Sequence, residues 1–163
     1  MVVMALVDAS VDLATHSTTM VCRSSPGLKV SVMFSFLAAF AEVRKKHSEA
    51  MLTICGDGEE MENLRAQAKA LALDGAVEFA GSCSREECAR RLKDSQAFVL
   101  PSRYETFGIV FVEAMGCGLP IIMTKTGAWK TLVRPETGLA VETEDPAGLA
   151  YACLLYTSPS PRD

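Results

Sequence analysis

The sequence predicts an α/β protein with a Rossmann-like, doubly wound parallel sheet that carries helices on both faces. Short apolar runs alternate along the chain with longer segments whose apolar residues recur at helical spacing. Alternation of this kind is typical of parallel sheets, because two neighbouring parallel strands are joined by a helical crossover. The chain has 163 residues, of which 49% are hydrophobic, so it can fill the core of one such domain.

The first half of the chain contains three predicted strands and two predicted helices. The opening residues 1–7 are apolar and predict a buried strand. They have no preceding basic residue and meet Asp8 at once, which fits neither a signal peptide nor a membrane span. The elements that follow are a helix over 30–47 with its apolar face on Val30, Met33, Phe34, Leu37 and Ala41, a strand at 51–55, a helix at 61–71 and a strand at 77–80.

The turn Gly56-Asp57-Gly58 follows one of these strands and invites comparison with a dinucleotide-binding fingerprint. The third glycine of that fingerprint would fall at position 61, which is Met61. We therefore interpret the segment as a tight turn between a strand and a helix.

The second half of the chain continues the alternation. Ser84, with Glu87 three residues later, predicts a capping box at the start of a helix that ends near Asp94. Asp145-Pro146 predicts the start of the last helix, because a capping residue precedes a proline at the first helical position. The elements between them are a strand at 97–100, a helix at 107–115 stopped by Gly116 and Gly118, and strands at 121–123 and 139–141.

The final segment YTSPSPRD is expected not to continue the last helix. It resembles a recurrent non-native ending of assembled environmental sequences. We therefore assign residues 1–152 to the folded domain and residues 153–163 to a non-native or disordered tail.

Two carboxylates, Glu105 and Glu113, flank the start of the helix predicted at 107–115. The first N–H groups of a helix lack internal partners and carry a partial positive charge, so the amides of Phe107, Gly108 and Ile109 can face a diphosphate. Gly108 lets such an anion approach the backbone closely. Carboxylates accept hydrogen bonds from hydroxyl groups, which ribose and sugars supply. The pattern favours a sugar bound through its diphosphate, with one carboxylate at the mouth of the pocket and the other deeper along the same side.

The same spacing also has a purely structural explanation. Glu105 would then complement the helix dipole, and Glu113 would be a solvated helix residue. Apolar neighbours such as Val112 and Ala114 argue against a fully solvated helix and predict a defined partner for Glu113. Ile109, Val112 and Met115 recur at helical spacing, which predicts the helix itself.

The segment FVLPSRYETFGIVFVEAMGCGLPIIMTKTGAWKTLV resembles the signature of the family 4 type of retaining glycosyltransferases (glycosyl transferases group 1), which have the two-domain GT-B fold. The two-glutamate part with its GxP ending is the most specific piece. The segments VCRSSPGLKVSVMFSFLAAFAEV, LTICGDGEE, VEFAGSCSREECARRL and TGLAVETEDPAGLA are similar in the same order, so the resemblance covers about residues 10–152. Residues Ser10-Val11-Asp12 resemble the link between the halves of a GT-B enzyme. The resemblance implies the C-terminal, donor-binding half, without the N-terminal half that holds the acceptor.

The resemblance also implies roles for individual residues. Glu113 would bind the ribose hydroxyls. Glu105 would be a catalytic residue that binds the hydroxyls of the donor sugar. Arg23 and Lys29 fall where the family places two cationic side chains that contact the phosphates and stabilise the leaving nucleoside diphosphate. If the resemblance is set aside, each is interpreted as an ordinary surface residue. The other implied donor-binding residues are Thr106, Phe107, Gly108, Ile109 and, near the base, Cys83.

Three positions depart from the family pattern. Val30 follows the lysine and Ala128 follows Gly127, where the family usually has glycine, and Thr131 stands where a glutamate is frequent. These departures concern the donor loop and the identity of the sugar, and they leave the two carboxylates and the two cations intact.

The expected activity is transfer of a sugar from a nucleoside diphosphate sugar to a sugar, lipid-linked or other small acceptor. The resemblance implies no cofactor and no metal. Two alternatives stay open: a fragment of a nucleotide-sugar epimerase with the same architecture, and a non-catalytic nucleotide-binding module. Peripheral membrane contact of a parent enzyme is compatible with the resemblance, although no basic amphipathic helix supports it.

Composition limits the partners and the compartment. The formal net charge of -4 and the pI near 5.3 argue against a nucleic-acid-binding protein. The six cysteines include no CxxC pair, which predicts reduced, mostly buried thiols of a cytoplasmic protein rather than a disulfide framework or a zinc site. The only histidines, His16 and His47, are far apart in sequence and give little support to a histidine-based metal site.

Overall fold

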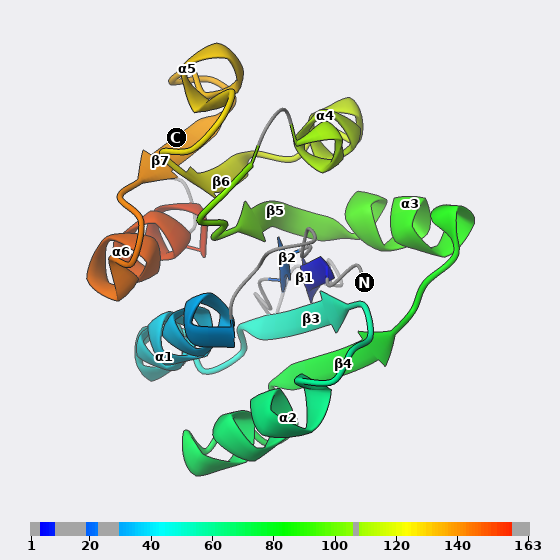
Figure 1. Ribbon diagram of the computed structural model, residues 1–163, viewed down its shortest axis with the longest axis vertical. Coiled ribbons are helices and arrows are strands. Elements are labelled where there is room, and N and C mark those ends of the chain that lie inside the picture. The colour runs from blue at the N-terminus through cyan, green and yellow to red at the C-terminus, as the bar shows by residue number, and fades with distance from the viewer. Residues whose placement is uncertain (1–3, 9–18, 23–29, 106–107, 158–163) are drawn as a thin grey trace.

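The computed structural model describes residues 4–8, 19–22, 30–105 and 108–157, which form one sheet with helices packed on both faces (Figure 1). Four residues that the sequence predicts for the site, Arg23, Lys29, Thr106 and Phe107, lie outside the described residues.

The elements confirm the predicted alternation of strands and helices. In chain order they are β1 Met4–Asp8, β2 Thr19–Cys22, α1 Val30–Lys46, β3 Met51–Cys55, α2 Met61–Ala70, β4 Val77–Gly81, α3 Arg85–Lys93, β5 Ser95–Leu100, α4 Ile109–Gly116, β6 Ile121–Thr124, α5 Trp129–Leu132, β7 Gly138–Val141 and α6 Pro146–Thr157. The predicted elements between residues 30 and 141 end within two residues of these bounds. The short helix α5 was not predicted, since it contains only four residues.

The seven strands follow the order β4-β3-β1-β2-β5-β6-β7. The predicted parallel arrangement is confirmed from β2 onward: β2 pairs in parallel with β3 and β5, and the outer pairs β3 with β4, β5 with β6 and β6 with β7 are also parallel. The strand β1 differs, because it is antiparallel to β2, β3 and β5. Only residues 9–18 separate β1 from β2, which is too short for the helical crossover that a parallel connection requires.

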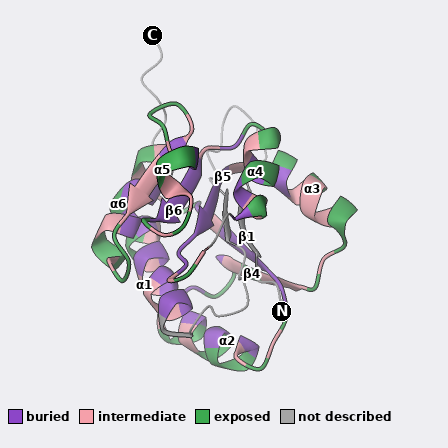
Figure 2. Ribbon diagram, turned by 45° about the horizontal axis from the view of Figure 1, so that its top comes forward, coloured by how far each residue is buried: buried purple, intermediate pink, exposed green. Residues whose placement is uncertain are grey.

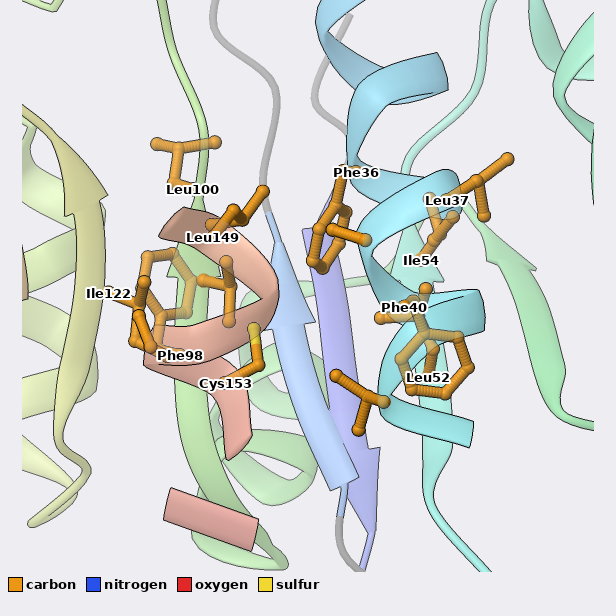
Figure 3. Packing of buried hydrophobic residues seen from close by; sticks show 14 of the residues in the cluster. Phe36, Leu37, Phe40, Leu52, Ile54, Phe98, Leu100, Ile122, Leu149 and Cys153 are labelled. Atoms are coloured by element: carbon orange, nitrogen blue, oxygen red, sulfur yellow. The ribbon is translucent and has the colours of Figure 1, made fainter. Parts of the chain in front are cut away.

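One face of the sheet is covered by α1 and α6, which pack against each other and against the central strands (Figure 3). Phe36 and Phe40 of α1 are fully buried, as are Leu52 and Ile54 of β3. The predicted apolar face of α1 is therefore only partly correct. Met33 and Leu37 are buried as expected, whereas Phe34 and Ala41 are half-buried, because the helix turns residues 36 and 40 toward the sheet. The buried residues, purple in Figure 2, line the strands and the inner side of α1.

The last helix extends past the domain boundary predicted at Ala152. It runs to Thr157, and Cys153 is completely buried between α6 and the sheet. Tyr156 also packs against the core. The expectation that YTSPSPRD cannot continue the helix is therefore wrong for its first two residues, because Tyr156 still has apolar surface to bury. Residues 158–163 lie outside the described part of the chain.

The opposite face carries α3 and α4, which follow β4 and β5 (Figure 1). The core is continuous below them, with Leu92 of α3 and Phe111 and Ala114 of α4 buried. Within the described residues, no helix has both the length and the apolar character needed to cross a bilayer.

Candidate functional site

A cleft of about 870 Å³ opens where β3 and β4 end. Its floor is formed by Cys55 and Gly56 at the end of β3, and by Ser82 and Cys83 in the connection after β4. In open α/β sheets, ligands bind beyond the carboxyl ends of parallel strands, which is where this cleft lies. Its two walls are α3 on one side and α4 on the other.

The wall formed by α3 begins at the predicted cap. The hydroxyl oxygen of Ser84 accepts a hydrogen bond from the backbone N–H of Glu87 at 3.1 Å, as the capping box requires. The second half of the box is absent, because the Glu87 carboxylate accepts hydrogen bonds from Arg90 Nη2 at 2.7 Å and Arg91 Nε at 2.6 Å. These two guanidinium groups, Arg90 first, hold the pKa of Glu87 below its ordinary value.

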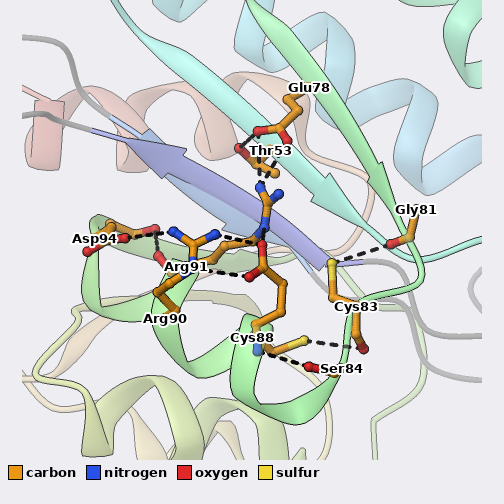
Figure 4. A network of polar contacts seen from close by, with 11 residues as sticks. Thr53, Glu78, Gly81, Cys83, Ser84, Cys88, Arg90, Arg91 and Asp94 are labelled. Carbon is orange, nitrogen blue, oxygen red and sulfur yellow. Dashed lines mark hydrogen bonds and ion pairs between the residues drawn. The ribbon is translucent and has the colours of Figure 1, made fainter.

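The same helix is tied to the sheet by a polar network (Figure 4). Arg91 Nη1 lies 3.0 Å from a carboxylate oxygen of Glu78 on β4. The hydroxyl of Thr53 on β3 donates to the same carboxylate at 3.2 Å. Arg91 is only 20% exposed, so its contact with Glu78 is better shielded from solvent than the Arg90–Asp94 ion pair of α3. The network fixes the cleft wall to the two strands that form the floor.

The wall formed by α4 depends on one glycine. Gly108 precedes the helix in the left-handed conformation, with φ 69° and ψ 61°. A Cβ atom there would lie 2.5 Å from Phe111 Cδ2 and 3.1 Å from Glu105 Cγ. Phe111 cannot retreat easily, because it is fully buried and packs edge-on against Phe98 with 5.3 Å between ring centroids. Glycine is therefore required here both for backbone conformation and for space.

The two sides of α4 have opposite surroundings. Phe111 and Ala114 face the core, whereas Ile109 is 65% and Val112 43% exposed, and both line the cleft. The helix predicted from the spacing of Ile109, Val112 and Met115 is confirmed, and the first two of these residues face the cleft. Met115 alone packs against the core, since the helix turns positions 109, 112, 113 and 116 together toward the cleft.

Glu113 lines the cleft together with Ile109 and Val112 and is exposed there. The expectation that this helix is not fully solvated is confirmed, because Phe111 and Ala114 are buried. An exposed carboxylate on the same side of α4 as Ile109 and Val112 offers a hydrogen-bond acceptor beside an apolar surface. A ligand with hydroxyl groups and a flat, partly apolar ring system matches that combination.

The structure brings together only some of the predicted site residues. Glu113, Ile109 and Cys83 all line the cleft. Glu105 does not line it; its side chain lies beside the backbone of Gly108, at the start of α4. The expectation that both carboxylates occupy one side of the same pocket is therefore wrong for this cleft.

Several lining residues were not predicted from the sequence, among them Ser82, Arg85 and Cys88. The sequence did contain a signal for these residues. The capping residue Ser84 places the start of α3 just after a strand, at the edge of the sheet where the cleft lies. Among the described residues, no cluster of three or more His, Cys, Asp or Glu side chains is suited to a metal ion.

The cysteines differ from the expected pattern of mostly buried thiols. The five described cysteines are free, but only Cys55 and Cys153 are buried. Cys83, Cys88 and Cys117 are half-buried, because they line the open cleft instead of the core. Burial raises the pKa of the Cys55 thiol, and the neighbouring Cys83 adds to this shift.

Comparison with known proteins agrees with this fold. The family described as Glycosyl transferases group 1 matches residues 32–156. A glycogen synthase from Mycobacterium tuberculosis is 34% identical over 117 residues, which is 71% of this chain and 28% of that protein. The sucrose-phosphate synthase structure from Thermosynechococcus elongatus is 30% identical, with a TM-score of 0.64 over 74% of this chain and 31% of that one.

A crystal structure of Anabaena HepE in complex with UDP and glucose has a TM-score of 0.71 at 22% identity, and the match covers 86% of this chain and 38% of that one. The chain thus spans less than a third of the glycogen synthase and of the sucrose-phosphate synthase. The chain belongs to the Glycosyl transferases group 1 family, and its fold is the Rossmann-like half of a GT-B glycosyltransferase.

Proposed function

We propose that this chain is the donor-nucleotide half of a retaining glycosyltransferase of the family 4 type. The observation that carries the proposal is that Glu113 is exposed, together with Ile109 and Val112, in a cleft at the carboxyl ends of β3 and β4. Family membership supports it, as do a relative named as a glycosyltransferase and a structural neighbour solved with UDP and glucose.

In this proposal the cleft binds the nucleoside part of a nucleoside diphosphate sugar. Glu113 accepts hydrogen bonds from the ribose hydroxyls, and the exposed aliphatic side chains of Ile109 and Val112 pack against the nucleoside. The base lies toward the connection after β4, near Cys83. A carboxylate suits two adjacent hydroxyls because it has two oxygens and is an acceptor only.

The diphosphate and the sugar lie at the start of α4. The amides of Phe107, Gly108 and Ile109, together with Thr106, bind them, and Arg23 and Lys29 stabilise the charge on the leaving diphosphate. Glu105, whose side chain lies beside Gly108, holds the sugar hydroxyls as positive character develops at the anomeric carbon. Catalysis in this proposal is therefore mainly electrostatic.

The acceptor is a sugar, a lipid-linked molecule or another small molecule, and a further domain of the parent enzyme binds it. A lipid-linked acceptor would bring the parent enzyme into peripheral contact with a membrane. The five free cysteines support a reducing, cytoplasmic location.

Calorimetric titration of the folded chain with nucleoside diphosphates and their sugar conjugates tests the proposal. We expect Glu113→Ala to weaken binding of the preferred nucleotide by about tenfold or more, because a charge-assisted hydrogen bond contributes about 1.5–3 kcal/mol. The urea midpoint should stay unchanged, since Glu113 is exposed.

Glu62→Ala is the matched control, because it removes a 90% exposed glutamate of α2 that does not line the cleft. Its affinity should equal that of the wild type. A folded wild type that binds no nucleoside diphosphate, or a Glu113→Ala variant that binds equally well, would contradict the proposal.

A further inference from the structure

Four of the residues that line the cleft are cysteines, and each comes from a different segment. Cys55 ends β3, Cys83 lies in the connection before α3, Cys88 is on α3 and Cys117 follows α4. All four are free thiols. Hydrogen bonding to a nucleotide does not require thiols, so the proposed function leaves this cluster unexplained.

Two of these thiols meet at the end of the β3–β4 pair. The register of the strands places Cys55 opposite Gly81. The carbonyl oxygen of Gly81 accepts one hydrogen bond from the Gly56 backbone N–H at 2.6 Å and another from the Cys83 thiol at 3.6 Å. The Cys83 thiol is therefore hydrogen-bonded to the residue that pairs with Cys55, which places Cys83 beside the end of β3.

The surrounding contacts give the two thiols different access to solvent. Cys55 is 2% exposed, whereas Cys83 is half-buried at the cleft surface. The Cys88 thiol donates to the carbonyl oxygen of Cys83 at 3.9 Å and so helps to hold the connection in place (Figure 4). A small reagent in the cleft therefore reaches the half-buried Cys83 more readily than the buried Cys55.

We propose that Cys55 and Cys83 are a redox-active pair, which a hydroperoxide converts to a disulfide that closes the cleft to nucleotide. The loss of nucleotide affinity rests on the proposed function, whereas formation of the disulfide does not.

The reaction balances in two steps. The Cys83 sulfur attacks the peroxide, the O–O bond breaks, and the products are a Cys83 sulfenic acid and water or an alcohol. The Cys55 sulfur then attacks the Cys83 sulfur, the S–O bond breaks, and the leaving oxygen takes the proton of Cys55 to give water. The two thiols are oxidised by two electrons in total, and the peroxide is reduced.

Formation of the disulfide changes the shape of the cleft, because a disulfide allows only a small range of distances between the two cysteines. A disulfide holds the two Cα atoms about 4.4–6.8 Å apart and the sulfurs about 2.05 Å apart. A disulfide between Cys83 and Cys55 removes the hydrogen bond from the Cys83 thiol to Gly81. It also draws the Ser82–Cys83 connection onto the end of β3. That connection is part of the floor on which the proposed base rests.

The test treats the whole chain with hydrogen peroxide and maps disulfides by mass spectrometry of a non-reducing digest. We expect one linkage, Cys55 to Cys83, and an affinity for UDP, the first probe, that falls about tenfold or more and returns after a thiol reductant is added. UDP present during oxidation should slow formation of the linkage, because it covers Cys83.

Cys83→Ser, whose UDP affinity is measured first in the absence of peroxide, should show the same affinity after peroxide treatment as before it. Cys117→Ser, the matched control on the opposite wall, should stay as sensitive as the wild type. Absence of the Cys55–Cys83 linkage, or unchanged UDP affinity in chains that carry it, would overturn the proposal. If the reduced chain binds no nucleoside diphosphate, the proposed function fails, and the disulfide map still decides whether the two cysteines form the pair.

Discussion

The two faces of the sheet use similar apolar side chains, but one face is closed and the other is open. On the closed face, α1 and α6 pack together, and Phe40 and Cys153 have no exposed surface. On the open face, Ile109 and Val112 of α4 remain exposed, because the wall opposite them is α3 across the cleft. The difference shows that an apolar residue is buried only when another element covers it, so the same residue type supports folding on one face and a binding surface on the other.

The largest effect is expected when one apolar residue from each face is replaced by alanine and the losses of unfolding free energy are compared. Phe40→Ala should lower the free energy of unfolding by about 3–5 kcal/mol, because it leaves a cavity in the closed face. Val112→Ala should cost less than about 1 kcal/mol, since Val112 is already 43% exposed. Urea unfolding of both variants measures the difference. Equal losses would show that the open face is packed as tightly as the closed one.

A second test changes the glycine that lets α4 contact both the core and the cleft. Gly108→Ala should destabilise the chain by about 2–4 kcal/mol, from left-handed backbone strain and from the overlap with Phe111. Gly118→Ala isolates the first contribution, because Gly118 has φ +81° with nothing within 4 Å of the added Cβ, and it should cost about 1 kcal/mol. A Gly108 variant no less stable than the Gly118 variant would exclude the overlap as a source of destabilisation.

The smallest effect concerns the charged wall of the open face. The pKa of Glu87 is lower in the folded chain than in the unfolded one, first because of Arg90 and then Arg91. Its contribution to stability is therefore complete above the ordinary pKa of 4.5 and is lost as the pH falls through the folded value. We expect the stability difference between wild type and Glu87→Gln to be constant from neutral pH down to about pH 5 and to shrink below the ordinary pKa.

Urea midpoints measured across this pH range check the expectation, with Glu62→Gln as the control on another exposed helix. The magnitude should be small, because Arg90 is exposed and Glu87 is still about one-third exposed to solvent. A difference that grows as the pH falls would have the wrong sign for this network.

Most of the local structure between residues 30 and 141 was predictable from the sequence. Apolar periodicity located the long helices, and Ser84 fixed the start of α3 through a contact only three residues away. The antiparallel direction of β1 was harder to predict, because the alternation pattern does not report how a strand without a crossover helix joins the sheet. The end of α6 was also missed, because the hydrophobic contact of Tyr156 with the core depends on residues far away in sequence.

The sequence by itself determined the alternation of strands and helices, the glutamate-rich segment and the resemblance to a glycosyltransferase family that the comparisons confirm. The tertiary structure decided which side of α4 faces the cleft, that Glu113 rather than Glu105 lines it, and that four distant cysteines gather there. Helical spacing shows which residues share one side of a helix, but what that side meets depends on segments brought together only by folding.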